Sequence, residues 1–486
     1  MKKLLLTLPV FLLIINFQTN AQESIGYSDP DDFQYLIDYR LPDWGYSNFY
    51  ISSAGSNFSS FDRSVRSQEG QPSDPFYELR NMDVSNRNYG IGVAPRFEFY
   101  KENEQRRIVF DSNISLNTNG RKTVSTDETT GNNFNFTSED FSKNSGKTFG
   151  NQIFFNISEY SEVESDLFFT AGLFSRIQYN REDSERKDDP GIERNVTLKR
   201  RTIYLNPSFG IGFGRLRNVT PMIRAIRVNE RYKELGNSAF NSNEIIQTAD
   251  LFTKVQGYQS TKDRFLKSFW GDINTGVNGK LTNLDSFDLF YLNDVFDENL
   301  GQRLEGYSLS ITGDYSYNNN LSKEEKSTSV STDTERDFSI TRVAAVNLNA
   351  EWYKNLNLYH QIHLDFSNST SFPLEKDIQE EWANTTSLNF GWLWNFADRF
   401  QFNSALENYL FTRELKDMPE DKFISFVSEI SGHFSYFIEN KMSLSAGLTL
   451  QYRKLDREFD TINLDDDLFV FSINAGVRYY FNRNLY

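Results

Sequence analysis

The sequence predicts an all-β fold: a transmembrane antiparallel β-barrel of about 14 strands with a small α-helical insert. Three observations predict it. Aromatic residues make up 15% of the 486 residues while the mean hydropathy is only -0.58, which excludes a bundle of membrane helices and a disordered chain. Long segments alternate apolar and polar residues with a period of two, as half-apolar strands do. Finally, tight turns alternate with longer polar segments, as they do in transmembrane barrels.

The N-terminus predicts export. Lys2 and Lys3 precede an apolar run over 4–15, and Thr19-Asn20-Ala21 supplies the small residues of a cleavage site. We therefore expect a signal peptide over 1–21, since the apolar run is shorter than the roughly 20 residues of a spanning helix. The sequence has no cysteine, which fits an oxidising compartment and excludes disulfides, thiol chemistry and a lipid-modified N-terminal cysteine.

The strands are predicted from hairpins such as 89–116. From Tyr89 to Phe99 every second residue is apolar, the polar segment 101–106 makes a turn, and the alternation resumes at Ile108. We expect strands of about 10 to 13 residues, the length that crosses a bilayer at a tilt. Tight turns are expected at 353–355, 397–399 and 438–441, and long polar loops at 61–87, 367–383 and 454–466.

The interval 216–303 does not alternate and has helix boundaries instead. Thr220-Pro221 is an N-terminal signal and Gly236 a C-terminal one. Further helices are expected from Asn243 to Gly257, from Thr261 to Trp270 with Gly271 after it, and from Asp285 to before Gly301. A packed helical subdomain is favoured over a long decorated turn. The predicted organisation is a signal peptide (1–21), an N-terminal periplasmic segment (22–43), a first set of barrel strands (44–215), a periplasmic helical insert (216–303) and a second set of strands (304–486).

Fourteen strands is the favoured count, with 16 as the alternative. Sixteen would result if Asn318-Asn319-Asn320 formed a turn, with one further strand over 323–332 and another within 284–291. The last strand ends with Tyr479, Tyr480 and Phe481, and the chain with Tyr486. This ending resembles the C-terminal strand by which the barrel-assembly machinery recognises its substrates, so that machinery is an expected partner, beside outer-membrane lipid and lipopolysaccharide.

The residues that alternate with the apolar ones are expected to line a lumen. Their charges are seven carboxylates against four arginines, which would favour cations in an open lumen and form a salt-bridged network in a closed one. The predicted lumen-lining residues are Arg96, Glu98, Asp111, Arg176, Asp314, Glu351, His363, Asp365, Glu407, Glu429, His433, Arg453 and Arg478. His360 is expected to face lipid.

No catalytic, cofactor or metal site is predicted. His363 and Asp365 share a face and are compatible with an acid–base pair, but a hydrogen-bonded lumen is the commoner reason for such residues. Gly210, Gly212 and Gly214 lack the helix and the downstream acid of a dinucleotide site, and suggest close approach by another segment. The net charge of -16 argues against nucleic-acid binding.

Several segments resemble porin-like outer-membrane β-barrels of Bacteroidetes-type bacteria, a family without an established substrate. They are Asn20-Ala21-Gln22, Tyr39 to Tyr46, Gly212-Phe213-Gly214-Arg215 and Asn218-Val219-Thr220, although Pro221 stands where an acidic residue is expected. The resemblance implies a Gram-negative envelope protein with a helical insert.

Three functions remain, in order of preference. The first is porin-like passage of small neutral or cationic solutes, passive or gated. The second is a structural or assembly barrel whose insert docks a periplasmic partner or the cell wall. The third, a hydrolase using His363 and Asp365, ranks last, so we expect no enzyme.

Overall fold

The chain was analysed as a computed structural model, which describes residues 30–69, 78–131, 135–188, 192–296, 298, 300–328, 330–375, 380–396, 400–416, 422–438, 442–459 and 462–479. The predicted signal peptide and the aromatic residues Tyr480, Phe481 and Tyr486 lie outside these ranges.

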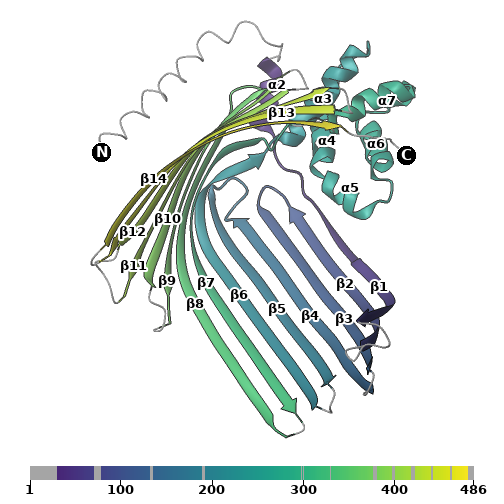
Figure 1. Cartoon of the computed structure of the whole chain (residues 1–486). Coiled ribbons are helices and arrows are strands. Elements are labelled where there is room, and N and C mark those ends of the chain that lie inside the picture. The colour runs from purple at the N-terminus through teal and green to yellow at the C-terminus, as the bar shows by residue number, and fades with distance from the viewer. Residues whose placement is uncertain are drawn as a thin grey trace.

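The described strands form one antiparallel sheet of 14 strands, in which each strand pairs with its neighbours in sequence (Figure 1). The strands are β1 (Trp44–Glu69), β2 (Glu78–Glu102), β3 (Arg106–Gly131), β4 (Asn135–Tyr160), β5 (Leu167–Asp188), β6 (Ile192–Asn218), β7 (Leu304–Thr328), β8 (Thr332–Asn355), β9 (His360–Pro373), β10 (Glu380–Phe396), β11 (Phe400–Leu415), β12 (Lys422–Ile438), β13 (Met442–Phe459) and β14 (Ile462–Tyr479). The favoured count is confirmed. Asn319 lies in the middle of β7 and pairs with Ile203 of β6, and the segment 284–291 is not a strand, so the 16-strand alternative is wrong.

The strands are longer than predicted. β1 to β8 have 22 to 27 residues and β9 to β14 have 14 to 18. The expected long loops were wrong for this reason: most of 61–87, 367–383 and 454–466 continues the flanking strands. Backbone pairing needs no apolar side chains, so a ladder can extend into polar sequence once a hairpin has set its register.

One face of the sheet carries exposed apolar side chains. Phe49 is 71% exposed, Ile211 50% and Ile473 68%, and residues of the same parity continue this apolar face from strand to strand. The opposite face is mainly polar, with some aromatic rings such as Phe154 and Phe168. None of the described helices combines the length and the apolar character needed to cross a bilayer.

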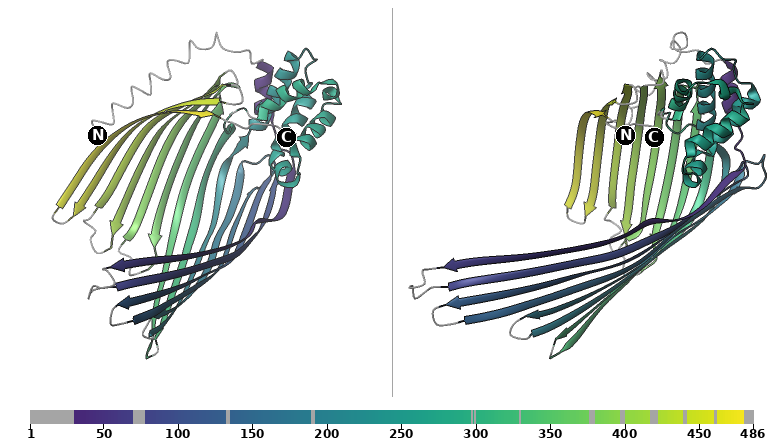
Figure 2. Two further views of the ribbon diagram at one scale, coloured as in Figure 1. Left: turned by 45° about the vertical axis from the view of Figure 1, so that its right-hand side comes forward. Right: turned by 90° about the vertical axis from the view of Figure 1, so that its right-hand side faces the viewer.

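The two edge strands do not meet within the described residues. β1 pairs only with β2 and β14 only with β13, and the views show the sheet curved but open between them (Figures 1 and 2). Neighbour pairing around a curved meander with an apolar outer face is the architecture of outer-membrane β-barrels, and the chain has the fold of that class.

The helical insert packs with a helix from the N-terminal segment. The helices are α2 (Pro30–Asp38), α3 (Thr220–Glu234), α4 (Ser242–Thr253), α5 (Val255–Thr261), α6 (Phe265–Gly276), η3 (Lys280–Asn283), α7 (Ser286–Asn293) and η4 (Asp294–Phe296). We call them together the helical unit. Its core includes Leu36 of α2, Ile226 of α3 and Phe269 of α6, and it reaches Leu358 between β8 and β9. The unit lies at the short-turn end of the sheet (Figures 1 and 2).

Three predicted helix boundaries need correction. Thr220 is the first helical residue and not the N-cap, because its hydroxyl instead accepts a hydrogen bond from the Arg303 backbone at 2.8 Å. The second predicted helix divides at Lys254, and Gly257 lies within α5. α6 runs through Gly271 to Gly276, so a solitary glycine did not end this helix. The α7 boundary at Asp285 is confirmed, with a capping box to Asp288.

Candidate functional site: the polar face of the sheet

All thirteen residues predicted to line a lumen lie on the polar face. Their cross-strand partners define this face, because residues paired across a ladder project to the same side. Glu98 pairs with Asp111 on β2 and β3, and Asp365 pairs with Glu351 on β9 and β8. The structure brings these residues into two groups at opposite ends of the strand order and leaves others apart.

The first group is compensated in charge. The Arg96 guanidinium lies 3.1 Å from a carboxylate oxygen of Glu98 and donates to Asp111 at 3.1 Å. The hydroxyl of Tyr50, on β1, donates to Glu98 at 2.9 Å. Arg176 lies two strands further along the sheet, with its guanidinium 5.7 Å from the ring centroid of Phe174. On this part of the face, therefore, cations and anions balance locally.

The second group is a row of directly paired residues across six strands. We call it the acid row: Glu351, Asp365, Asn389, Glu407, Glu429 and Gln451, on β8 to β13 in order. Four of the six are carboxylic acids. Within the described residues, none of the four forms an ion pair with a lysine or arginine. Carboxylates directly opposite each other repel, as Glu351 and Asp365 do and as Glu407 and Glu429 do, so the row is costly without nearby cations.

Neutral and weakly basic groups contact the row. The Tyr353 hydroxyl donates to Asp365 at 3.1 Å, and the Tyr353 ring stacks on the His363 ring with centroids 5.1 Å apart. His363 Nε2 lies 3.6 Å from Asp365 Oδ2. Gln451 donates to Glu429 at 3.1 Å. These contacts fix the side chains in place without supplying a permanent positive charge.

The geometry gives the His363–Asp365 pair no nucleophile. Within the described residues, no serine or threonine hydroxyl is hydrogen-bonded to His363. The nearest serine along the strand on this face, Ser367, is bonded to Ser387 at 2.7 Å. A hydrolytic triad needs a hydroxyl or thiol within hydrogen-bond reach of the base. Nor do three or more His, Asp or Glu side chains of the described chain gather in a way that could hold a metal ion.

The remaining predicted residues are not members of the row, although Arg453 follows Gln451 on the same face of β13. Asp314 accepts a hydrogen bond from Asn347, and His433 bonds with the Ser435 hydroxyl at 3.0 Å. Arg453 and Arg478 are on β13 and β14, opposite Val427 and Ser443. His360, predicted to face lipid, lies on the apolar face, where it stacks on Trp392 and Trp394.

The helical unit reaches the polar face at β1. A Cβ on Gly257 of α5 would lie 3.4 Å from the Trp44 ring, so helix and ring are in contact. The Asn48 side chain donates to the Ser260 carbonyl at 2.8 Å. α5 therefore covers the polar face where β1 begins.

Glycines on the same face also allow close approach. The Phe168 ring occupies the space beside Gly212, where a Cβ would lie 2.2 Å from the ring. The predicted close approach at the glycine run is thus made by an aromatic ring of the neighbouring strand β5.

Sequence parity would also place Tyr353, Asn389 and Gln451 on this face. The register that aligns them with the carboxylates could not be read from one strand at a time.

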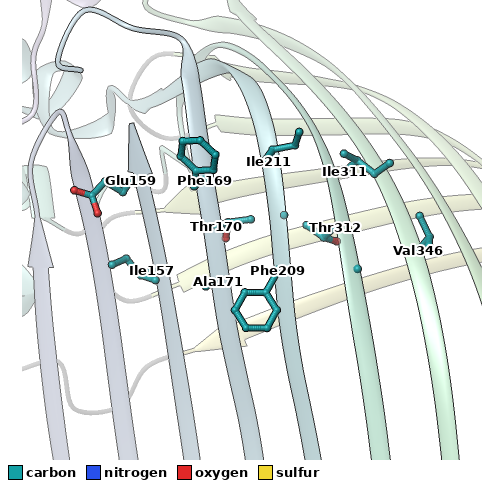
Figure 3. Close-up of a pocket in the computed structure, with 12 residues that line it drawn as sticks. Ile157, Glu159, Phe169, Thr170, Ala171, Phe209, Ile211, Ile311, Thr312 and Val346 are labelled. Atoms are coloured by element: carbon teal, nitrogen blue, oxygen red, sulfur yellow. The ribbon is translucent and has the colours of Figure 1, made fainter. Parts of the chain in front are cut away.

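A hollow of about 640 Å³ lies on the opposite, apolar face (Figure 3). Its lining includes Phe169, Phe209, Ile211 and Ile311. Gly313 also lines it, and a Cβ there would meet no atom within 4 Å. Because its walls are those of the apolar face, this hollow suits an acyl chain better than a polar solute.

Comparison with known proteins finds matches of low similarity among solved structures. No family model matches the sequence, and no curated protein matches it. Among solved structures, the ferric yersiniabactin uptake receptor FyuA from Yersinia pestis aligns at 6% identity over 89% of this chain and 72% of its own, with a TM-score of 0.31. The CymD monoaromatic hydrocarbon channel aligns at 8% identity over 95% and 96%, with a TM-score of 0.25. The alcaligin outer-membrane receptor FauA from Bordetella pertussis aligns at 10% identity over 90% and 75%, with a TM-score of 0.21.

Likeness of this degree transfers no residue role. The strand order and the exposed apolar face of the chain itself are those of an outer-membrane β-barrel. On those grounds it is an outer-membrane protein.

Proposed function

We propose that the chain is a porin-like barrel that passes small neutral or cationic solutes across the outer membrane. The acid row carries the proposal. Four carboxylic acids, Glu351, Asp365, Glu407 and Glu429, cross five adjacent strands, β8 to β12, without a lysine or arginine partner within the described residues. Around an aqueous path, side chains of one sign attract the opposite ion and repel the like one.

The test is ion selectivity in a planar bilayer. With a KCl gradient across the refolded protein, the reversal potential should have the sign of a cation-preferring pore. Glu351→Gln, Glu407→Gln and Glu429→Gln together should move it toward zero. The matched control removes three carboxylates from the apolar side of the sheet, Glu128→Gln, Glu139→Gln and Glu185→Gln, and should leave the reversal potential unchanged. A protein without conductance, or one in which both triple variants behave alike, contradicts the proposal.

A second function is supported by the surface of the helical unit. Phe287 of α7 is 83% exposed and Phe290, one turn further along, 48%, and adjoining exposed apolar side chains of this kind mark interaction surfaces. We propose as the alternative that this helix docks a periplasmic partner or the cell wall. Phe287→Ser with Phe290→Ser should abolish a pull-down that the wild-type protein gives from periplasmic extract or peptidoglycan. Ile246→Ser, which changes another exposed apolar residue of the unit, should retain the pull-down.

A further inference from the structure

Basic residues on the apolar side of the sheet follow a regular pattern. On each of β2 to β7, the first charged residue beyond the apolar segment, counted away from the short-turn end, is a lysine or an arginine. These residues are Arg87, Lys122, Lys147, Arg181, Arg201 and Lys323. The pattern stands out because the chain as a whole carries a net charge of -16.

The ladder aligns these bases with further ones in two rows. Lys147, Arg181, Lys199, Lys323 and Arg336 are directly paired across β4 to β8. Arg87, Lys122 and Lys143 are directly paired across β2 to β4. We call the eight residues, together with Arg201, the basic collar. Like charges directly opposite each other are destabilising, so nine bases on seven neighbouring strands need anions close by.

The protein supplies only part of that negative charge. Arg181 pairs with Asp183 at 2.9 Å and Lys323 with Glu325 at 3.5 Å, each on its own strand. The Lys122 ammonium lies 5.2 Å from the Phe141 ring centroid. Lys147 and Lys199 flank Arg181 in the first row, and neither forms an ion pair within the described residues. An external anion would therefore meet free ammonium groups on both sides of Arg181.

The collar lies at the depth of lipid headgroups. On β5 the outward apolar segment runs from Leu167 to Tyr179, and on β6 from Phe213 to Ile203. These segments measure about 33 to 40 Å along the strand, or about 25 to 30 Å along the barrel axis for strands tilted by about 40° from it. That is the thickness of a hydrocarbon layer, and Arg181 and Arg201 follow directly. On β9, β10 and β11, by contrast, no described outward position holds a lysine or arginine.

We propose that the basic collar binds the phosphate groups of lipid A in the outer leaflet, on the side of the barrel formed by β2 to β8. The inference rests on the membrane placement assumed by the proposed function, but it does not require an open pore. Phosphorylated sugar headgroups supply dense negative charge at the edge of the apolar band, and lysine and arginine are the side chains that bind phosphate.

The test measures lipid A bound to the refolded protein in detergent by native mass spectrometry. The probes are lipid A carrying its phosphates and the same lipid after enzymatic dephosphorylation. The wild-type protein should retain the phosphorylated form preferentially. Lys147→Gln with Lys199→Gln should weaken its binding roughly thirtyfold, at about 1 kcal/mol for each base near a lipid surface. Lys147→Arg with Lys199→Arg should restore it.

The matched control is Lys233→Gln with Lys267→Gln, which removes two exposed lysines from the helical unit and should leave binding unchanged. Each variant should migrate faster on a denaturing gel before boiling than after it, as expected of a folded barrel, so that misfolding is separated from loss of binding. Equal retention of both lipid forms, or equal loss in collar and control variants, overturns the proposal. So does competition by millimolar inorganic phosphate, which would indicate a site for free phosphate. Conductance and lipid retention are measured separately, so a protein without conductance that still retains lipid A refutes only the pore.

Discussion

The guanidinium of Arg303 donates a hydrogen bond of 3.1 Å to the carbonyl oxygen of Leu358, which ties the end of the helical insert to the turn between β8 and β9. A second bond, of 3.3 Å, goes to Asn355. Arg303 is fully buried and has no carboxylate partner within the described residues. Burial, with a smaller contribution from Arg227, lowers the pKa of Arg303 to about 9. The junction therefore depends on a buried cation held by neutral acceptors.

Replacing Arg303 should loosen the helical unit. Arg303→Met removes both hydrogen bonds and leaves the Leu358 carbonyl buried without a donor, which costs about 1 to 3 kcal/mol. We expect a lower thermal unfolding midpoint of the helical signal in circular dichroism, with the strand signal little changed. Arg264→Met, at an exposed position before α6, serves as the control. Equal midpoints for the two variants would contradict a structural role for the junction.

The helical unit should lose stability in acid through Glu244. Its carboxylate accepts from the Asn241 backbone at 2.8 Å, from Lys280 at 2.7 Å and from Asn278 at 3.1 Å. Burial acts to raise the pKa of Glu244, but these donors outweigh it and hold the pKa below its ordinary value. A carboxyl group whose folded pKa is depressed stabilises the fold above its unfolded pKa, near 4.3, and that stability is lost as the pH falls through the folded value.

Glu244→Gln should therefore lower the unfolding midpoint of the helical unit at pH 7 and flatten its decline between about pH 5 and pH 3. The loss at pH 7 should be about 1 to 3 kcal/mol, because Lys280 is left without its anion. Thermal unfolding followed by circular dichroism at 222 nm, repeated at pH values across this range, measures the change in midpoint. Asp263→Asn, at an exposed site, should reproduce the wild-type profile. If Glu244→Gln keeps the full acid-induced decline, another carboxylate is responsible.

α5 should restrict passage along the polar face, because it covers the face at Trp44 and Asn48. Replacing residues 255–261 with a glycine–serine segment of equal length should raise single-channel conductance on the order of twofold, by widening the path. The same replacement over 286–293, which removes α7, should leave conductance unchanged. A rise in both variants would point to general loosening of the unit instead.

The free edges of β1 and β14 should pair in the membrane. Unpaired backbone groups in lipid cost several kcal/mol each, so a spanning sheet must close. With an even number of strands, 14, the closing pair of β1 and β14 is antiparallel, like every other pair of neighbouring strands. The chain has no native cysteine, so Ser47→Cys can be combined in turn with Phe471→Cys, Ile473→Cys, Ala475→Cys and Val477→Cys, all outward positions. One combination, or two adjacent ones, should form a disulfide in the heat-modifiable protein. Absence of any crosslink would mean that another segment covers these edges.

Much of the fold could be predicted because it depends on local patterns. Period-two alternation identifies the strand faces, and meander topology follows from short connections, so strand number and the placement of Glu351 or Asp365 needed no tertiary information. Strand ends were not predictable in the same way. Beyond Lys454 the sequence is polar, yet the β13–β14 ladder continues through Asp456 paired with Asp465, held by backbone hydrogen bonds that the composition does not reveal.

The register between neighbouring strands was the second feature that could not be predicted from the sequence. Parity places Glu407 and Glu429 on one face, but only the alignment of β11 with β12 sets them opposite each other. The basic collar was missed for the same reason, because Lys147, Arg181 and Lys199 are far apart in sequence and look like ordinary loop charges. In the helical unit, Arg303 lies 83 residues from the Thr220 hydroxyl that it bonds, a contact without a local signal.

The difference in strand length gives the barrel an oblique mouth. β1 to β8 run for 22 to 27 residues and β9 to β14 for 14 to 18, and the long strands extend well beyond the others (Figure 2). At about 3.3 Å per residue, this leaves a wall some 20 to 30 Å higher on one side. Molecules would enter from the low side, near the membrane surface, and would reach the acid row only near the middle of the short strands. Large molecules that approach along the strand direction would meet the tall side first, so the entrance would lie in its shelter.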